Sequence, residues 1–200
     1  MSADRIGKVV ALVRGSGLLR PRDLDAHGIS RAYLQMAVAR KLVARSGRGI
    51  YRLPEAETTE HLALIECAKR VPQGVVCLLS ALQFHGLTTQ LPPDLWLAIG
   101  EKAWRPRLDY PPLRVAYFSG KALTEGIETH TIQNVPVRIY NVAKTIADCF
   151  KYRNKVGLDV CIEALREGWR QRKVTADDLW RFSKVCRVSN VMRPYLESVV

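Results

Sequence analysis

The stretch Ser30–Leu53, SRAYLQMAVARKLVARSGRGIYRL, constrains the fold more than any other part of the chain. Ser30 is a favourable N-cap, and the residues after it have helical periodicity. Leu34, Ala37, Val38 and Lys41 fall on one face of this helix. Two short apolar runs follow, 42–44 and 50–53, and the loop between them contains two glycines and two arginines. Glycine permits the positive φ angles of a hairpin turn. A helix followed by a basic hairpin is the arrangement in which a winged helix-turn-helix meets DNA.

Two further helices are expected before Ser30. Residues 4–14 place Ile6, Val9, Val10 and Val13 on one side, and residues 15–17, Gly-Ser-Gly, end this helix. Pro21 suits a first helical turn, so a short helix is expected over 21–26, with Gly28 in a left-handed conformation at its end. Leu24 and Ile29 are expected inside the three-helix core. We therefore predict a winged helix-turn-helix domain over residues 1–54, which ends at the polar segment that begins with Pro54.

The charge distribution supports a polyanionic partner for this domain. The net charge is +12, and residues 1–53 contain 11 Lys and Arg residues against only three Asp residues. Nucleic acid, and for a winged helix double-stranded DNA, is the leading candidate for the partner of such a basic domain. The residues expected to contact DNA, through bases, phosphates or the positioning of the helix, are Arg20, Arg22, Ser30, Arg31, Tyr33, Gln35, Met36, Arg40, Arg45, Arg48 and Arg52. The alternative is a three-helix core whose outer face is only solvated.

Composition excludes several other classes of protein. No apolar run reaches the length of about 20 residues that a membrane span needs. The N-terminus lacks the layout of a secretory signal, so a cytoplasmic protein is expected. The five cysteines, at positions 67, 77, 149, 161 and 186, form no C-x-x-C pair. Buried thiols are therefore expected, with neither a zinc site nor disulfides, and no metal or cofactor.

Residues 55–200 are expected to form a larger α+β domain with a small β-sheet and C-terminal helices. A first helix should run from a cap at Thr58 or Thr59 to about Arg70. Strands are expected over 75–79, 95–99, 113–118, 127–132 and 135–139, with a short helix over 81–85 capped by Ser80. Further helices should begin after Asn141, near Gly157 or Asp159, after Thr175 and at Ser189, and Ser119-Gly120 should form a turn.

No catalytic constellation emerges from this larger region. The residues Asp94, Glu101 and Lys102 faintly resemble a PD-(D/E)xK nuclease pattern, but adjacent Glu and Lys residues on a strand point to opposite faces. Lys144 and Asp148 are four residues apart, so a helical ion pair or buried scaffold residues are expected. His85 is expected to pack or to cap a helix. The basic and aromatic residues 104–107, WRPR, could contact a partner or form a solvated loop.

The ordered motifs resemble the AbiEi family, the antitoxins of type IV toxin–antitoxin systems. The segments LLRPRDLDAHGISRAYLQ and SGRGIYRLP resemble the N-terminal winged helix of that family. The segments VVCLLSALQFHGLTTQLP, VPVRIYNVAKTIADCFKYRNKVGLDVCIEALRE and VMRPYLESV resemble parts of its antitoxin domain.

This resemblance implies a repressor that binds inverted repeats in its own operon. The resemblance also implies a C-terminal domain that counteracts a nucleotidyltransferase-like toxin, without requiring a stable complex with it. Because the larger region shows no catalytic constellation, the protein is not expected to be an enzyme. Two alternatives remain: a metal-dependent nuclease or toxin-modifying enzyme, and a transcription factor that senses a ligand and has no toxin.

Overall fold

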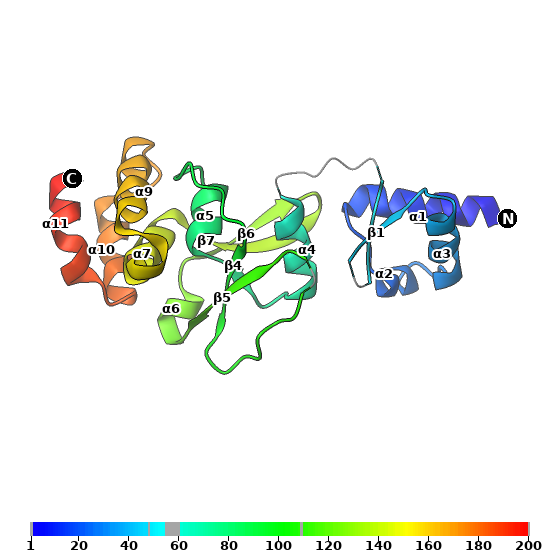
Figure 1. Cartoon of the computed structure of the whole chain (residues 1–200), viewed down its shortest axis with the longest axis horizontal. Coiled ribbons are helices and arrows are strands. Elements are labelled where there is room, and N and C mark those ends of the chain that lie inside the picture. Colours follow the sequence, from blue (N-terminus) through cyan, green and yellow to red (C-terminus); the bar gives the residue numbers. More distant parts are fainter. Residues whose placement is uncertain (1, 48, 55–60, 109, 200) are drawn as a thin grey trace. The chain divides into compact units, whose positions relative to one another are not determined.

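The computed structural model describes residues 2–47, 49–54, 61–108 and 110–199. The chain divides into two compact units. The first comprises residues 1–72, 107–111 and 131–137, and the second comprises residues 73–106, 112–130 and 138–200. The elements combine helices with a mixed β-sheet, as the expected α+β class requires (Figure 1). The predicted boundary at Pro54 stays a prediction, because the adjoining residues 55–60 lie outside the described residues.

The first unit begins with three helices and a small antiparallel sheet. The elements are α1 (Ser2–Ser16), α2 (Pro21–Asp25), α3 (Arg31–Ala39), β1 (Ala44–Gly47), β2 (Ile50–Arg52) and α4 (Leu62–Arg70). Pro21 occupies the first turn of α2, and Gly28 has a φ of 62°, as the sequence predicts. Strand β1 begins two residues later than expected. Thr58 and Thr59, the expected caps of α4, lie outside the described residues.

Two apolar clusters hold these elements. Ile6, Val9 and Val13 of α1 pack with Leu24, Ile29, Leu34 and Ala37 and with Tyr51 of β2. A second cluster joins Leu18, Ile50, Leu62, Ile65 and Val135. Ile50 and Tyr51 are adjacent in β2 and therefore point to opposite faces of the strand. Both faces of β2 are thus buried, which fixes the orientation of the hairpin relative to the helices.

A five-stranded sheet with the order β5-β4-β3-β7-β6 lies mostly in the second unit, and residues 131–132 of β6 and 135–137 of β7 belong to the first. Its strands are β3 (Val75–Val76), β4 (Leu95–Gly100), β5 (Leu113–Phe118), β6 (Ile127–Ile132) and β7 (Val135–Tyr140). Strand β3 is antiparallel to β4 and parallel to β7, and β4 runs parallel to β5. Leu95 through Ile99 of β4 are all buried, which is typical of a strand covered on both faces.

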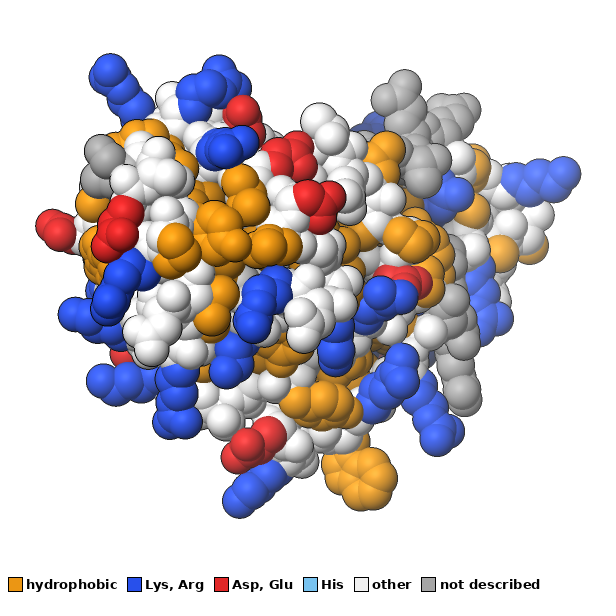
Figure 2. Space-filling model, turned by 60° about the vertical axis from the view of Figure 1, so that its left-hand side comes forward, with side chains coloured by type: hydrophobic (Ala, Val, Ile, Leu, Met, Phe, Trp, Pro, Cys, Tyr) orange, Lys and Arg blue, Asp and Glu red, His pale blue; other side chains and the backbone are white. Residues whose placement is uncertain are grey.

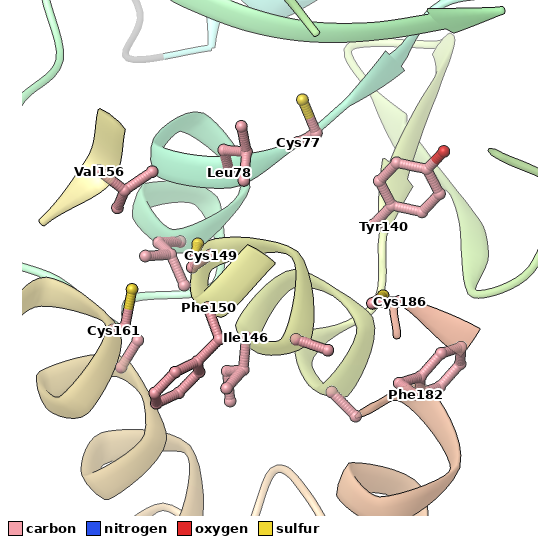
Figure 3. Packing of buried hydrophobic residues seen from close by; sticks show 14 of the residues in the cluster. Cys77, Leu78, Tyr140, Ile146, Cys149, Phe150, Val156, Cys161, Phe182 and Cys186 are labelled. Atoms are coloured by element: carbon pink, nitrogen blue, oxygen red, sulfur yellow. The ribbon is translucent and has the colours of Figure 1, made fainter. Parts of the chain in front are cut away.

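The helices of the second unit are α5 (Leu78–Phe84), α6 (Gly120–Thr124), α7 (Val142–Lys151), α8 (Arg153–Val156), α9 (Leu158–Arg170), α10 (Ala176–Val185) and α11 (Ser189–Val199). Helix α7 packs against α5, α9 and α10. Figure 3 shows Ile146, Cys149 and Phe150 of α7 among the labelled side chains of this core. All five cysteines are buried free thiols, as expected.

Local signals correctly predict the starts of α7, α9, α10 and α11, whereas the starts of α5, α6 and α8 were not predicted. The side chains of Asn141 and Thr175 accept hydrogen bonds from Lys144 N (2.9 Å) and Asp178 N (3.1 Å), as N-caps do. The expected strand over 75–79 was wrong after Val76, because α5 already begins at Leu78. Ser80 is therefore not a cap; it lies inside α5, and its hydroxyl accepts a hydrogen bond from Trp96 N (2.9 Å). Ser119-Gly120 was wrong as a simple turn, because Ser119 is the N-cap residue of α6.

Lys144 and Asp148 form a buried ion pair inside this core, which confirms their interpretation as buried scaffold residues. Their side chains are 0% and 3% exposed, and Lys144 Nζ lies 2.5 Å from Asp148 Oδ2. The ammonium group also lies over the rings of Tyr140 and Phe118, 4.1 and 4.8 Å from their centroids. Asp148 accepts a further hydrogen bond from Cys186 Sγ at 3.2 Å.

The stability of the protein should carry a pH signature of Asp148. Burial raises the pKa of Asp148 to about 6, and the attraction of Lys144 offsets only part of this shift. The pKa of an Asp carboxyl in the unfolded state is about 3.9. A carboxyl with a higher pKa in the folded state stabilises the fold fully at pH values below about 3.9. Its contribution is then lost as the pH rises towards 6. Two pKa units correspond to about 3 kcal/mol.

Asp148→Asn should therefore remove a decline in unfolding free energy of about 2 kcal/mol between pH 4 and pH 6.5. Urea unfolding of both proteins across this range measures the difference. Asp177→Asn, at an exposed position of α10, should follow the wild-type curve closely. Parallel curves for wild type and Asp148→Asn would contradict the prediction.

Candidate nucleic-acid interface

Helix α3 presents the outer face that the sequence predicts. Ser30 is its N-cap, and the Ser30 Oγ accepts a hydrogen bond from Ala32 N at 3.4 Å. Leu34 and Ala37 are fully buried against the three-helix core. The exposed residues of the helix and its C-cap are Arg31, Ala32, Gln35, Met36, Ala39 and Arg40. The two alanines lie in the first and last turns of α3 and leave this face shallow there, so a surface could approach the helix backbone closely.

The hairpin lies next to α3, and backbone hydrogen bonds tie it to the segment between α1 and α2. Leu19 forms an isolated bridge with Tyr51, with N–O distances of 2.8 and 2.9 Å. The register pairs Arg45 with Tyr51 and Ala44 with Arg52, and it shifts between Arg45 and Gly47. Gly49 has a φ of 72°, as the sequence-based hairpin prediction requires. Arg48, expected at the hairpin tip, lies outside the described residues.

The two described arginines of the hairpin belong to opposite faces. Directly paired residues of an antiparallel ladder share a face. Arg45 is exposed on the face of Tyr51, whose hydroxyl lies 3.5 Å from Gln35 Nε2 of α3. Arg52 is half-buried on the face of Ile50. Arg45 is therefore the described hairpin cation that belongs with the exposed face of α3.

The remaining predicted residues occupy two kinds of position. Arg22 on α2 is exposed. Arg31 Nη2 lies 2.6 Å from Asp25 Oδ2, and the hydrogen bond from Arg31 lowers the pKa of Asp25. Tyr33 is half-buried against the three-helix core. The exposed face of α3 thus carries one cation that is paired within the protein and one, Arg40, at the helix end.

Arg20 is placed differently from the other predicted cations. Its guanidinium is half-buried and donates a hydrogen bond to the carbonyl of Lys69 in α4, and its backbone N–H donates to Asp23 Oδ2 at 2.8 Å. Burial lowers the pKa of Arg20. These contacts assign Arg20 a role in holding α2 and α4, which its position in the sequence does not reveal.

Lys41 is an exposed cation that the sequence pattern did not indicate. Lys41 was expected on the buried face of the helix, and this was wrong. The helix ends at Ala39, with Arg40 as C-cap, and Lys41 turns into a left-handed conformation with a φ of 57°. The exposed Lys41 ammonium therefore joins Arg40 at the C-terminal end of α3. A glycine after Arg40 would have signalled this turn, and the sequence has none there.

The residues that suggested a nuclease are not brought together. Asp94 precedes β4 and pairs with Arg114 at 3.3 Å, whereas Glu101 follows β4 at its other end. Six strand residues separate such positions by about 20 Å. Within the described ranges, no group of three His, Cys, Asp or Glu residues is arranged to hold a metal ion.

His85 is a helix C-cap, as predicted, and its Nε2 lies 2.7 Å from the carbonyl oxygen of Tyr140. Burial lowers its pKa. Trp104 of the WRPR segment is 95% exposed. None of the helices in the described part of the chain combines the length and apolar character that crossing a membrane requires.

Comparison with known protein families finds a match in the N-terminal region. Residues 8–54 match the model of a family described as transcriptional regulator, AbiEi antitoxin. This range covers most of α1, all of α2 and α3, and the β1–β2 hairpin. No curated protein matches the chain. The N-terminal part of the chain is therefore similar to the AbiEi antitoxin transcriptional regulators.

Proposed function

We propose that this protein is a cytoplasmic DNA-binding antitoxin that represses its own operon. Residues 1–54 act as a winged helix-turn-helix and bind inverted repeats in the operator. The region after residue 54 counteracts a nucleotidyltransferase-like toxin, with or without a stable complex. The observation that carries the proposal is the exposed face of α3, on which small, amide and cationic side chains adjoin a basic hairpin.

The residues of this face suit both tasks of a DNA-binding helix, which are to recognise bases and to bind phosphates. Ala32 and Ala39 permit close approach, and Gln35 has the amide that pairs with adenine in the major groove. Arg22, Arg40, Lys41 and Arg45 supply cations for phosphates beside α3, and Arg52 supplies one from the opposite face of the hairpin. Arg31 can bind DNA only if it gives up its ion pair with Asp25. Arg20 supports the interface indirectly, by holding α2 and α4 together.

The direct test is a gel-shift titration with the DNA that precedes the protein's own reading frame. We expect retardation at protein concentrations at least ten times lower than for a scrambled fragment of equal length. Equal affinity for both fragments would contradict operator recognition. Co-expression with a nucleotidyltransferase-like protein encoded beside it tests the antitoxin role separately, by rescue of growth.

Arg40→Ala should weaken binding to every DNA sequence to a similar extent. Removal of one phosphate contact should lower the slope of log K against log salt concentration by about 0.9. Fluorescence anisotropy at four salt concentrations measures this slope for the operator and for the scrambled fragment. Arg193→Ala removes an exposed arginine of α11 and serves as the control. An unchanged slope for Arg40→Ala would place Arg40 away from the DNA backbone.

A further inference from the structure

A basic hollow opens in the second unit, between the end of β5, α6, α7 and the end of α10. Its volume is about 460 Å³, within the usual range for small-molecule sites. Four cationic side chains line it: Lys121, Lys151, Lys184 and Arg187. Figure 2 brings the side of the C-terminal helices forward. On the face that it shows, Lys and Arg side chains are widely spread and Asp and Glu side chains are fewer.

The floor of the basic hollow contributes little opposing charge. Asp148 is the one acidic residue among the described residues that line it. Its charge is compensated by Lys144 at 2.5 Å, and both side chains are buried. Lys121 Nζ lies 3.9 Å from Glu125 Oε1, but the Lys121 side chain is 82% exposed, so this ion pair is weak. The hollow therefore attracts anions, and its four cations match the charge of a di- or triphosphate.

A second hollow of about 520 Å³ adjoins the first and is aromatic. Tyr117 and Tyr152 line both hollows, and Trp96, Arg114 and Lys155 line only the second. The Tyr152 hydroxyl donates a hydrogen bond to the Tyr117 carbonyl at 3.3 Å, which orders the two residues at the boundary. Tyr117 is 45% exposed. An exposed tyrosine beside a cationic hollow offers a ring face on which a base can stack.

We propose that the two hollows together bind a nucleoside di- or triphosphate. The phosphates lie among Lys121, Lys151, Lys184 and Arg187, and the base stacks on Tyr117. A bare phosphate or pyrophosphate would use only the basic hollow, so the adjoining aromatic hollow favours a nucleotide. The proposed site lies entirely within the second unit. A test of nucleotide binding is therefore independent of whether residues 1–54 bind the operator.

Isothermal titration calorimetry of the full chain with ATP, GTP, CTP and UTP tests the site, with and without Mg²⁺. We expect saturable binding of at least one triphosphate with a Kd below about 100 μM. Pyrophosphate should bind at least tenfold more weakly. No saturable binding of any triphosphate would overturn the proposal. Binding of a 5′-phosphorylated RNA oligonucleotide without binding of free triphosphates would also overturn it.

Two variants separate the parts of the site. Lys184→Ala/Arg187→Ala should weaken triphosphate and pyrophosphate binding by about tenfold or more. Tyr117→Ala should weaken only triphosphate binding, by about tenfold, and leave pyrophosphate unaffected. Arg166→Ala/Arg193→Ala removes two exposed arginines outside the hollows and controls for net charge. Equal losses in this control and in Lys184→Ala/Arg187→Ala, at unchanged melting temperatures, would overturn the assignment of the basic hollow.

Discussion

Ala32→Glu is expected to lower the affinity of the protein for its operator DNA roughly 100-fold, or about 2.7 kcal/mol. Ala32 is exposed in the first turn of α3, where a recognition helix meets base edges and phosphates. A carboxylate at this position would be repelled by the negative charge of the DNA. The larger glutamate side chain would also keep the helix backbone away from the base edges. Gel-shift titration of the operator fragment at fixed salt measures the loss.

The same substitution should leave the fold at least as stable as wild type. A carboxylate near a helix N-terminus is stabilising by about 0.3–1 kcal/mol. The hydrogen bond from Ala32 N to Ser30 Oγ involves the backbone and is retained. Loss of DNA binding with an equal or higher melting temperature would therefore locate the effect at the interface. A lowered melting temperature would point to unfolding instead.

Ala103→Glu provides the matched control, because it changes the net charge equally at an exposed position of the second unit. We expect its operator affinity to fall no more than about twofold, through long-range electrostatics alone. If both substitutions weaken binding to the same extent, α3 is not the helix that meets DNA.

Lys144→Met is expected to produce a large loss of stability, about 3 kcal/mol at neutral pH. The substitution leaves the buried Asp148 carboxylate without its cation. The cost should shrink by about 1 kcal/mol at pH 5, because acidification protonates the carboxyl whose pKa burial already raises. Urea unfolding at pH 7 and pH 5 measures both quantities.

The double variant Lys144→Met/Asp148→Leu should recover most of this loss, because replacing both charges of a buried pair by apolar groups is often neutral. Lys102→Met, at an exposed turn after β4, should change stability by less than about 0.5 kcal/mol. A double variant that is less stable than Lys144→Met would show that the pair has another structural role.

Local chemistry by itself determined where most helices begin and which face of α3 is buried. Serine, asparagine and threonine side chains satisfy the free N–H groups of the turn that follows them, so Ser30, Asn141 and Thr175 mark helix starts without any tertiary contact. The bounds of β5, β6 and α11 also follow from short-range apolar patterns and turn residues. The basic charge of residues 1–53 is likewise a property of the sequence alone.

Tertiary packing decided the features that depend on residues distant in sequence. Ser80 resembles a cap, but Trp96 on β4 supplies its hydrogen-bond partner and leaves it inside α5. Arg20 resembles a DNA contact, yet the Lys69 carbonyl binds its guanidinium. The basic hollow gathers Lys121, Lys151 and Lys184 from three helices that are separated in the chain. No local pattern encodes such convergence, because it arises only when the helices pack around the β-sheet.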